Sequence, residues 1–239
     1  MPRRRAVHYV VLVGALALAG VATAATTDPQ FAVDPADQSW AHAVVLTRAD
    51  LGTGWRQTPP AKEAQEEETG SDASMAFCPE AISDQSDLVV TGGASSDFTR
   101  GSSSVTSFAT IWRTEEDAQA SFDRTVAVMP ALQACTAKIL TASFSGIRMT
   151  VTENRALPFP ALTPQLAAYR LKVVIKSTGR TPKKPKPLVV NYDTILFGRG
   201  RATVWLMVTS FSDRPVSMVK ERSLARALAA RVELDPASP

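Results

Sequence analysis

The sequence has few of the side chains that most enzyme and metal sites require. Its 239 residues include only two histidines and two cysteines. No CxxC pair, HExxH, GxSxG, phosphate-binding loop or dinucleotide-binding glycine pattern is present. Because His8 lies among the first 24 residues, His42 is the only histidine of the remaining chain. Zinc sites of the usual kind therefore lack ligands, and we expect no catalytic residue, no bound metal and no cofactor.

The sequence also lacks an apolar run typical of a membrane-spanning helix. Arginines at positions 3–5 precede an apolar run over residues 7–21, which ends in the small residues of Ala22-Thr23-Ala24. This run has about 15 residues, fewer than the roughly 20 needed to cross a bilayer. The pattern is typical of a secretory signal peptide over residues 1–24. We therefore expect a secreted or extracytoplasmic protein of the cell envelope, with no stable transmembrane segment after cleavage; whether the segment is cleaved or kept as an anchor stays open.

The expected mature chain has no excess of either charge. The whole sequence holds 26 Lys and Arg against 23 Asp and Glu, and residues 1–24 contain three arginines and no acid. Their removal leaves 23 basic and 23 acidic residues (26 minus 3, against 23). General nucleic-acid binding needs a basic surface, so we expect no nucleic-acid partner.

Cys78 and Cys135 are the only cysteines. In an oxidising compartment, an even pair is most simply one disulfide. It would close a loop of about 57 residues and stabilise the fold by roughly 4 kcal/mol in the chain-entropy model, less any strain. A redox pair or a metal site is the alternative, but the spacing is not CxxC and no histidines lie nearby.

Hydrophobic periodicity and turn residues predict one α+β domain over residues 37–233, between a linker at 25–36 and a tail at 234–239. Helices are expected from Asp34 to about Leu46, for one turn after Thr47, from Thr114 through about Ile139 with a break or kink at Pro130, and from Asp213 onward. The last of these would carry Val219, Leu224, Ala227 and Leu228 on its apolar side.

Strands are expected near residues 56, 87–99, 103–113, 147–152, 169–176, 188–198 and 202–208. Strands that follow one another without a helix form hairpins, so we predict an antiparallel sheet of about six strands with helices packed on it.

Alternation in the later strands predicts a cationic, partly aromatic surface. If the apolar residues of each strand point to the core, the intervening polar residues share the other side of the sheet. Arginine and tryptophan together suit anionic or sugar-like groups. The candidate ligand-binding residues are Arg148, Arg170, Lys172, Arg201, Thr203 and Trp205, with Thr150 beside them. A plain solvated sheet face is the alternative interpretation.

Ser217 and Lys220 match the SxxK pattern of serine–lysine nucleophiles. A serine near a helix N-terminus can be activated by a lysine one turn on. The SDN and KTG elements that accompany this pattern would have to follow it, and only 19 residues lie beyond Lys220. An exposed first helical turn is therefore the favoured interpretation.

The segment Leu46–Trp55 is similar to the LT-x-x-DL-x-x-GW opening of exported actinobacterial proteins. The match extends to Cys78-Pro79, to Phe122 with Pro130 and Cys135, and to Gly198–Arg201. Over about residues 37–232, the chain resembles the extracellular sensor domain of PknH-type serine/threonine kinases and related PsbP-like exported lipoproteins. The resemblance implies a non-catalytic, ligand-binding α+β sandwich around an antiparallel sheet. This chain has no kinase domain or lipobox cysteine, and it has one cysteine pair where the kinase sensor would carry two disulfides.

These observations favour an exported, non-catalytic binding or sensing protein whose partner is a small molecule, a glycan or an envelope protein. An envelope scaffold or assembly protein that binds only other proteins is the alternative, and a hydrolase with an unrecognised site is the second. A deep polar pocket near Arg170 and Arg201 would favour solute binding, and a broad apolar patch would favour a protein partner. Clustering of Ser217 and Lys220 with an acid in a cleft would favour the enzyme.

Overall fold

The computed structural model describes residues 28–58, 83–142, 147–177, 186–212 and 215–233, and only the backbone of 136–142. The expected signal peptide, Cys78 and the tail 234–239 lie outside the described residues. No helix among the described residues combines the length and apolar character that crossing a bilayer requires.

The described chain forms helices and strands in the order that the sequence predicts, with one short strand added at the start. The elements are β1 (Gln30–Phe31), α2 (Pro35–Val44), α3 (Arg48–Leu51), β2 (Arg56–Thr58), β3 (Val89–Arg100), β4 (Ser103–Trp112), α5 (Glu115–Ala142), β5 (Ile147–Ala156), β6 (Gln165–Ser177), β7 (Leu188–Arg199), β8 (Ala202–Ser210) and α6 (Met218–Val232).

The strands form one sheet in the order β1-β3-β4-β8-β7-β6-β5, with β2 paired to β3 beside this path. Every pairing is antiparallel except β1 with β3. The predicted α+β class with an antiparallel sheet is therefore confirmed. The sheet has eight strands rather than about six. The strand expected near residue 56 is present as β2, whereas β1 was not expected, because its two residues are too few to show an alternating pattern.

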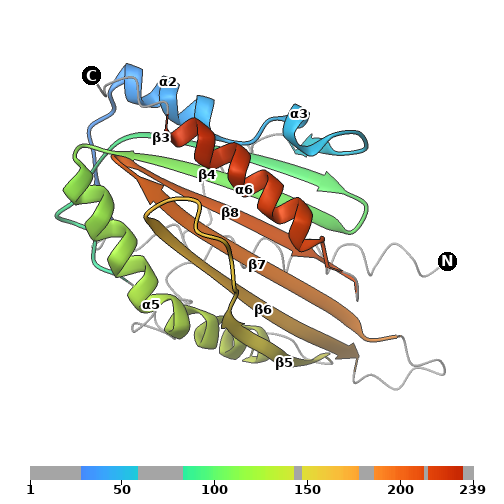
Figure 1. Ribbon diagram of the computed structural model, residues 1–239. Coiled ribbons are helices and arrows are strands. Elements are labelled where there is room, and N and C mark those ends of the chain that lie inside the picture. Colours follow the sequence, from blue (N-terminus) through green and yellow to red (C-terminus); the bar gives the residue numbers. More distant parts are fainter. Residues whose placement is uncertain (1–27, 59–82, 143–146, 178–185, 213–214, 234–239) are drawn as a thin grey trace.

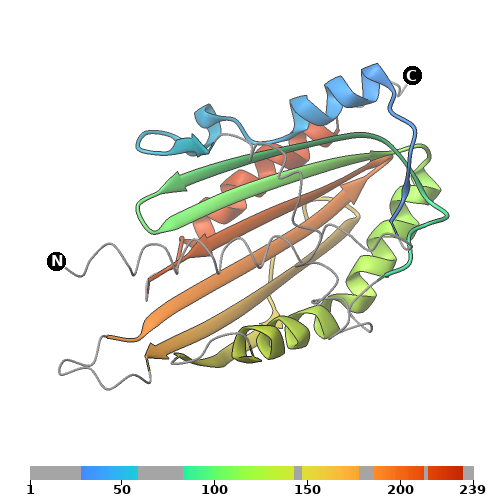
Figure 2. The ribbon, with the colours of Figure 1, turned by 180° about the vertical axis from the view of Figure 1, so that it is seen from behind.

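Helices cover both faces of the sheet (Figures 1 and 2). Helices α2 and α6 lie on one face, over a core that includes Val204 and Leu206 of β8 and Ile195 and Phe197 of β7. Helix α5 lies on the opposite side, where its Ala118 packs with the apolar residues at the start of β3 and the end of β4, and its later turns contact β5. Strand β7 has apolar residues on both of its faces, because both faces are buried.

The helix starts follow the capping residues in the sequence. Asp34 accepts hydrogen bonds from the backbone N–H groups of Ala36 and Asp37, at 2.8 and 3.1 Å. Thr47 and Asp50 form the predicted capping box of α3. Thr114 accepts from the N–H of Asp117 at 3.1 Å. These side chains satisfy amide groups that have no partner within the helix, which explains why the starts could be predicted locally.

Two helix predictions need correction. Helix α5 continues through Pro130 to Ala142 without being divided into two helices. Helix α6 begins at Met218 with Ser217 as its N-cap, not at Asp213. Val219 is 76% exposed, because it does not lie on the side of α6 that packs on the sheet. The residues buried on that side are Glu221, Leu224, Ala225, Leu228, Ala229 and Val232.

Candidate functional site

The predicted ligand-binding residues do not form one surface. Arg170 pairs across the sheet with Asp193, which pairs with Val208, so Arg170 faces the side covered by α6. Trp205 pairs with Leu196 and faces the other side, since successive strand residues alternate. Thr203 shares the side of Trp205, whereas Arg148 and Lys172 share the side of Arg170. The expected common surface is therefore wrong.

The physical reason lies in the two buried faces of the sheet. The apolar residues of β6, such as Leu171 and Val173, pack in the cluster on the α5 side. Those of β8, such as Val204 and Leu206, pack under α2 and α6. A single polar surface would require the apolar residues of every strand to point to one core. Because each face has its own core, the polar residues of β6 and β8 point in opposite directions.

Two of the three candidate arginines, Arg170 and Arg201, are held in internal ion pairs. The Nε of Arg170 donates to Asp193 Oδ1 at 2.6 Å, and its Nη2 donates to the other carboxylate oxygen. Arg201 donates to both oxygens of Asp37 at 2.8 and 2.9 Å. Thr203 accepts a hydrogen bond from the indole of Trp112 at 2.9 Å. These contacts tie the fold together, and they leave the two arginines without a shared pocket.

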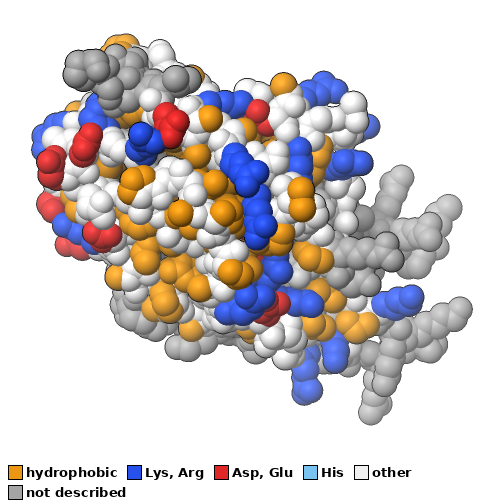
Figure 3. Space-filling view, viewed as in Figure 1, with side chains coloured by type: hydrophobic (Ala, Val, Ile, Leu, Met, Phe, Trp, Pro, Cys, Tyr) orange, Lys and Arg blue, Asp and Glu red, His pale blue; other side chains and the backbone are white. Residues whose placement is uncertain are grey.

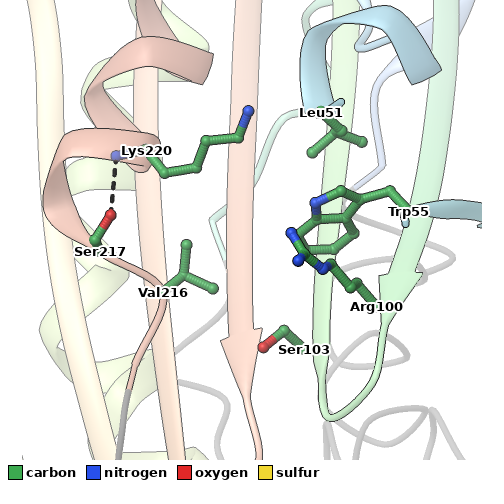
Figure 4. A pocket seen from close by; sticks show the side chains of 7 residues that line it. All are labelled: Leu51, Trp55, Arg100, Ser103, Val216, Ser217 and Lys220. Carbon is green, nitrogen blue, oxygen red and sulfur yellow. Dashed lines mark hydrogen bonds between the residues drawn. The ribbon is translucent and has the colours of Figure 1, made fainter. Parts of the chain in front are cut away.

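A hollow of about 480 Å³ lies elsewhere, between the start of α6, helix α3 and the β3–β4 hairpin (Figure 4). We call it the α3–α6 hollow. Its lining residues are Leu51, Trp55, Arg100, Ser103, Val216, Ser217 and Lys220. It brings together segments from three distant parts of the sequence. None of the six predicted ligand-binding residues lines it, whereas both residues of the SxxK pattern do.

Two glycines shape this hollow. Gly52 and Gly54 follow α3 with φ angles of 84° and 86°, a conformation that favours glycine. The chain then turns so that Trp55 is packed into the core with 4% exposure. A Cβ atom at Gly54 would lie 3.3 Å from the Nε of Arg100. The glycine therefore lets the guanidinium of Arg100 lie close to the chain beside Trp55.

The hollow has a positive character. Its lining includes Arg100 and Lys220 and no carboxylate. Among the described residues, neither cation makes an ion pair; the Nζ of Lys220 donates to the backbone carbonyl of Asp50 at 2.8 Å. A carbonyl leaves the charge of the ammonium unneutralised. Two cations, a tryptophan and two serine hydroxyls can contact a small anion or a sugar-like group.

Ser217 and Lys220 are arranged as a helix cap. The hydroxyl oxygen of Ser217 accepts a hydrogen bond from the backbone N–H of Lys220 at 3.3 Å, and the lysine side chain extends away from it (Figure 4). The carboxylate of Asp50 accepts from Arg231 at 2.6 Å instead of contacting Lys220. The cluster of serine, lysine and acid that would favour a hydrolase is therefore not assembled by these described residues.

A second hollow of about 330 Å³ lies beside the start of α5. It is lined by Glu115, Glu116 and Gln119 of α5, by Pro164 and Gln165, and by the β7–β8 turn. Acidic residues in a first helical turn offset the helix dipole. The amide of Gln165 donates to Gln119, so the polar groups of this hollow largely serve the fold.

Trp55 and Arg100 are possible site residues that no sequence motif indicated. Trp55 is only the end of a motif in the sequence, and Arg100 falls between the strands expected near residues 87–99 and 103–113. The signal that could have found them is the pair of tight turns at Gly52–Gly54 and Gly101, because turns place neighbouring side chains at the ends of a sheet. Their meeting with α6 depends on packing that no local pattern specifies.

Cys135 is buried and is not a free thiol. Its predicted partner, Cys78, lies outside the described residues. The pairing of the two therefore stays a prediction.

Comparison with known proteins gives a likeness in fold. The chain matches no family model and no curated protein. Its structure is similar to the crystal structure of the extracellular domain of PknH from Mycobacterium tuberculosis, at 10% sequence identity and a TM-score of 0.42. The likeness covers 84% of this chain and 100% of that chain. The expected relation to PsbP-like lipoproteins stays a prediction.

Proposed function

We propose that this protein is a non-catalytic binding or sensing protein that acts outside the cytoplasm, and that the α3–α6 hollow binds a small anionic solute. The observation that carries the proposal is the pair of cations in this hollow, Arg100 and Lys220, with no carboxylate in its lining. Uncompensated positive charge attracts anions.

The chemistry of the lining suits a compact ligand. Arg100 offers a planar fork of donors that matches a carboxylate or a phosphate. Lys220 uses one of its three N–H donors on the carbonyl of Asp50. Ser103 and Ser217 add hydroxyl groups at the rim, and Leu51 and Val216 add apolar contact. The volume of about 480 Å³ lies in the range of small-molecule pockets.

The location follows from the sequence. Residues 1–24 have the cationic start, the apolar run and the small-residue ending of a secretory signal peptide. The burial of Cys135 as a non-free thiol is compatible with an oxidising compartment. We therefore propose an extracytoplasmic protein of the cell envelope.

A scaffold that binds only proteins has less support. The exposed large hydrophobic side chains of the described residues are Phe31, Val33 and Val219, and Val219 lies apart from the other two in the sequence. Figure 3 shows basic side chains along the face that carries α6, interspersed with apolar and neutral groups. Protein-binding surfaces more often have one continuous apolar patch.

The test is a binding series with matched probes. Succinate and glucose 6-phosphate represent carboxylate and phosphate ligands, and glucose is the uncharged counterpart. We expect the anions, but not glucose, to raise the melting temperature, because a ligand of the folded state stabilises it. We expect Arg100→Gln to weaken anion binding at least tenfold, as measured by calorimetry.

Arg148→Gln is the control, because Arg148 is exposed on β5 and does not line the hollow. If the two substitutions weaken anion binding equally, the result would contradict an anion site in this hollow. Binding of glucose as tightly as glucose 6-phosphate would contradict it as well. Capture of an envelope protein with no response to any probe would favour the scaffold. Turnover of a probe ester that is lost in Ser217→Ala would favour a hydrolase.

A further inference from the structure

A buried acid follows Lys220, a residue of the hollow, in the first turn of α6. Glu221, in the first turn of α6, has 0% exposure, and neither of its carboxyl oxygens has a hydrogen-bond donor among the described groups. It faces Asp193 of β7, whose side chain is 2% exposed. Arg170 of β6 binds that aspartate through two hydrogen bonds. Two carboxyl groups thus share one cation in a dry site.

The charges around this site do not neutralise a second anion. On its own helix, Glu221 has Arg222 as a neighbour, whose positive charge acts on it. The negative charge of Glu153 of β5 acts on Arg170 through space. Strand β8 carries no ionisable residue. The acids of the other helices packed against α6 are already paired, Asp37 with Arg201 and Asp50 with Arg231. Arg170 is therefore the guanidinium that hydrogen-bonds Asp193 and also acts on Glu221, and Arg222 acts on Glu221 only through space.

This arrangement determines which acid holds a proton. Burial, followed by the charge of Asp193 and a hydrogen bond to it, raises the pKa of Glu221 from its ordinary value of 4.5 to about 8. Arg170 and Arg222 act in the opposite direction and are outweighed. At neutral pH the Glu221 carboxyl is protonated, and its O–H can donate to the Asp193 carboxylate.

We propose that Glu221 and Asp193 form a buried proton-binding site that fastens the first turn of α6 to the sheet. The bound proton links Glu221 to Asp193, and Asp193 is in turn held by Arg170. Loss of the proton places a second negative charge in a site that has no water contact. An uncompensated buried charge is costly, so the first turn of α6 then leaves the sheet for solvent.

This turn also carries two residues of the α3–α6 hollow. Ser217 caps the helix, and Lys220 immediately precedes Glu221. Release of the turn moves the ammonium of Lys220 away from the hollow. The proton site would therefore set the pH range in which the hollow binds anions; this consequence, unlike the proton site itself, rests on the proposed function.

The sign of the pH effect is fixed by linkage. Because the folded pKa lies above the unfolded one, the folded protein binds more protons between pH 4.5 and about 8. Its stability is fully present below this window and falls as the pH rises through it. Each pH unit increases the unfolding equilibrium constant by about tenfold relative to a protein without this group. Above pH 8 the effect levels off.

Glu221→Gln tests the site without ligand. The amide has the shape of the protonated acid and can donate to Asp193, but it does not titrate. Urea unfolding is measured from pH 5 to pH 9. The unfolding equilibrium constant of the wild-type protein should rise about tenfold per pH unit relative to that of E221Q. Glu116→Gln, at an exposed position of α5, is the control and should parallel the wild type. Parallel curves for wild type and E221Q would overturn the proposal.

Two further measurements keep the proposal testable if E221Q fails to fold. Carbon-13 NMR of the wild-type carboxyl groups should show one glutamate that titrates near pH 8, and the absence of such a resonance would overturn the proton site. Glucose 6-phosphate affinity of the wild type should fall at least fivefold from pH 7 to pH 9; where E221Q folds, its affinity should fall less. If no probe binds but the glutamate titrates near pH 8, the proton site stands and the proposed function fails.

Discussion

Asp37 and Arg201, 164 positions apart in the chain, form an ion pair joined by two hydrogen bonds of 2.8 and 2.9 Å. The guanidinium carbon of Arg201 also lies 5.6 Å from the ring centre of Trp40. Thr91 of β3 donates a third hydrogen bond to the same carboxylate. The pair therefore fastens α2 to the turn between β7 and β8, at the end of the sheet opposite the α3–α6 hollow.

Removing one partner of this pair should destabilise the fold. We expect Arg201→Ala to lower the free energy of unfolding by about 3 kcal/mol, because Asp37 is left as a buried, unpaired charge. Arg199→Ala is the matched control: its ion pair with Glu233 has two half-exposed side chains, and such pairs contribute about 0.5 kcal/mol. Urea denaturation at pH 7 measures both. Equal losses would show that the Asp37–Arg201 pair has no special structural role.

The same pair predicts an acid sensitivity. The hydrogen bond from Arg201 holds the pKa of Asp37 below its ordinary value, against burial, which raises it. Its contribution to stability is therefore present above the unfolded pKa of the carboxyl and is lost as the pH falls through the folded pKa. Arg201→Ala should flatten this part of the stability profile below pH 4, whereas Arg199→Ala should leave it unchanged.

Two neighbouring glycines of β3 should differ sharply in their tolerance of a side chain. A Cβ atom at Gly92 would lie 2.5 Å from the backbone carbonyl of Asp37, whereas a Cβ at Gly93 meets nothing within 4 Å. We expect Gly92→Ala to lower the free energy of unfolding by about 3 kcal/mol, because α2 has to move off the sheet. Gly93→Ala should change it by less than about 0.5 kcal/mol. Similar melting temperatures for the two variants would contradict the close packing of α2 on β3.

The cysteine pair gives a chemical prediction. Non-reducing peptide mapping of the purified protein should recover Cys78 linked to Cys135, and thiol titration should find no free thiol. Reduction should lower the free energy of unfolding by roughly 4 kcal/mol in the chain-entropy model, less any strain relieved. Recovery of both peptides unlinked from the oxidised protein would show that the prediction is wrong.

Local rules specified the helix caps and the hairpins. Asp34, Thr47 and Thr114 each satisfy backbone groups within a few residues, and such contacts depend only on nearby sequence. Strand alternation and short connections likewise indicated an antiparallel sheet. The start of α6 was predicted too early because Asp213 and Ser217 are both acceptable caps, and only the packing of the helix on the sheet selects the second.

Sequence alone thus determined the class of fold, the order of its elements and the export pattern of residues 1–24, because these depend on periodicity and composition. Only the tertiary structure decided which face of the sheet each strand buries, since β7 is apolar on both sides and is compatible with either orientation of its neighbours. It also decided that Trp55, Arg100 and Lys220 meet, and that Glu221 is enclosed beside Asp193. These encounters join segments far apart in the chain, and the charge and burial that give them their chemistry arise only when those segments pack.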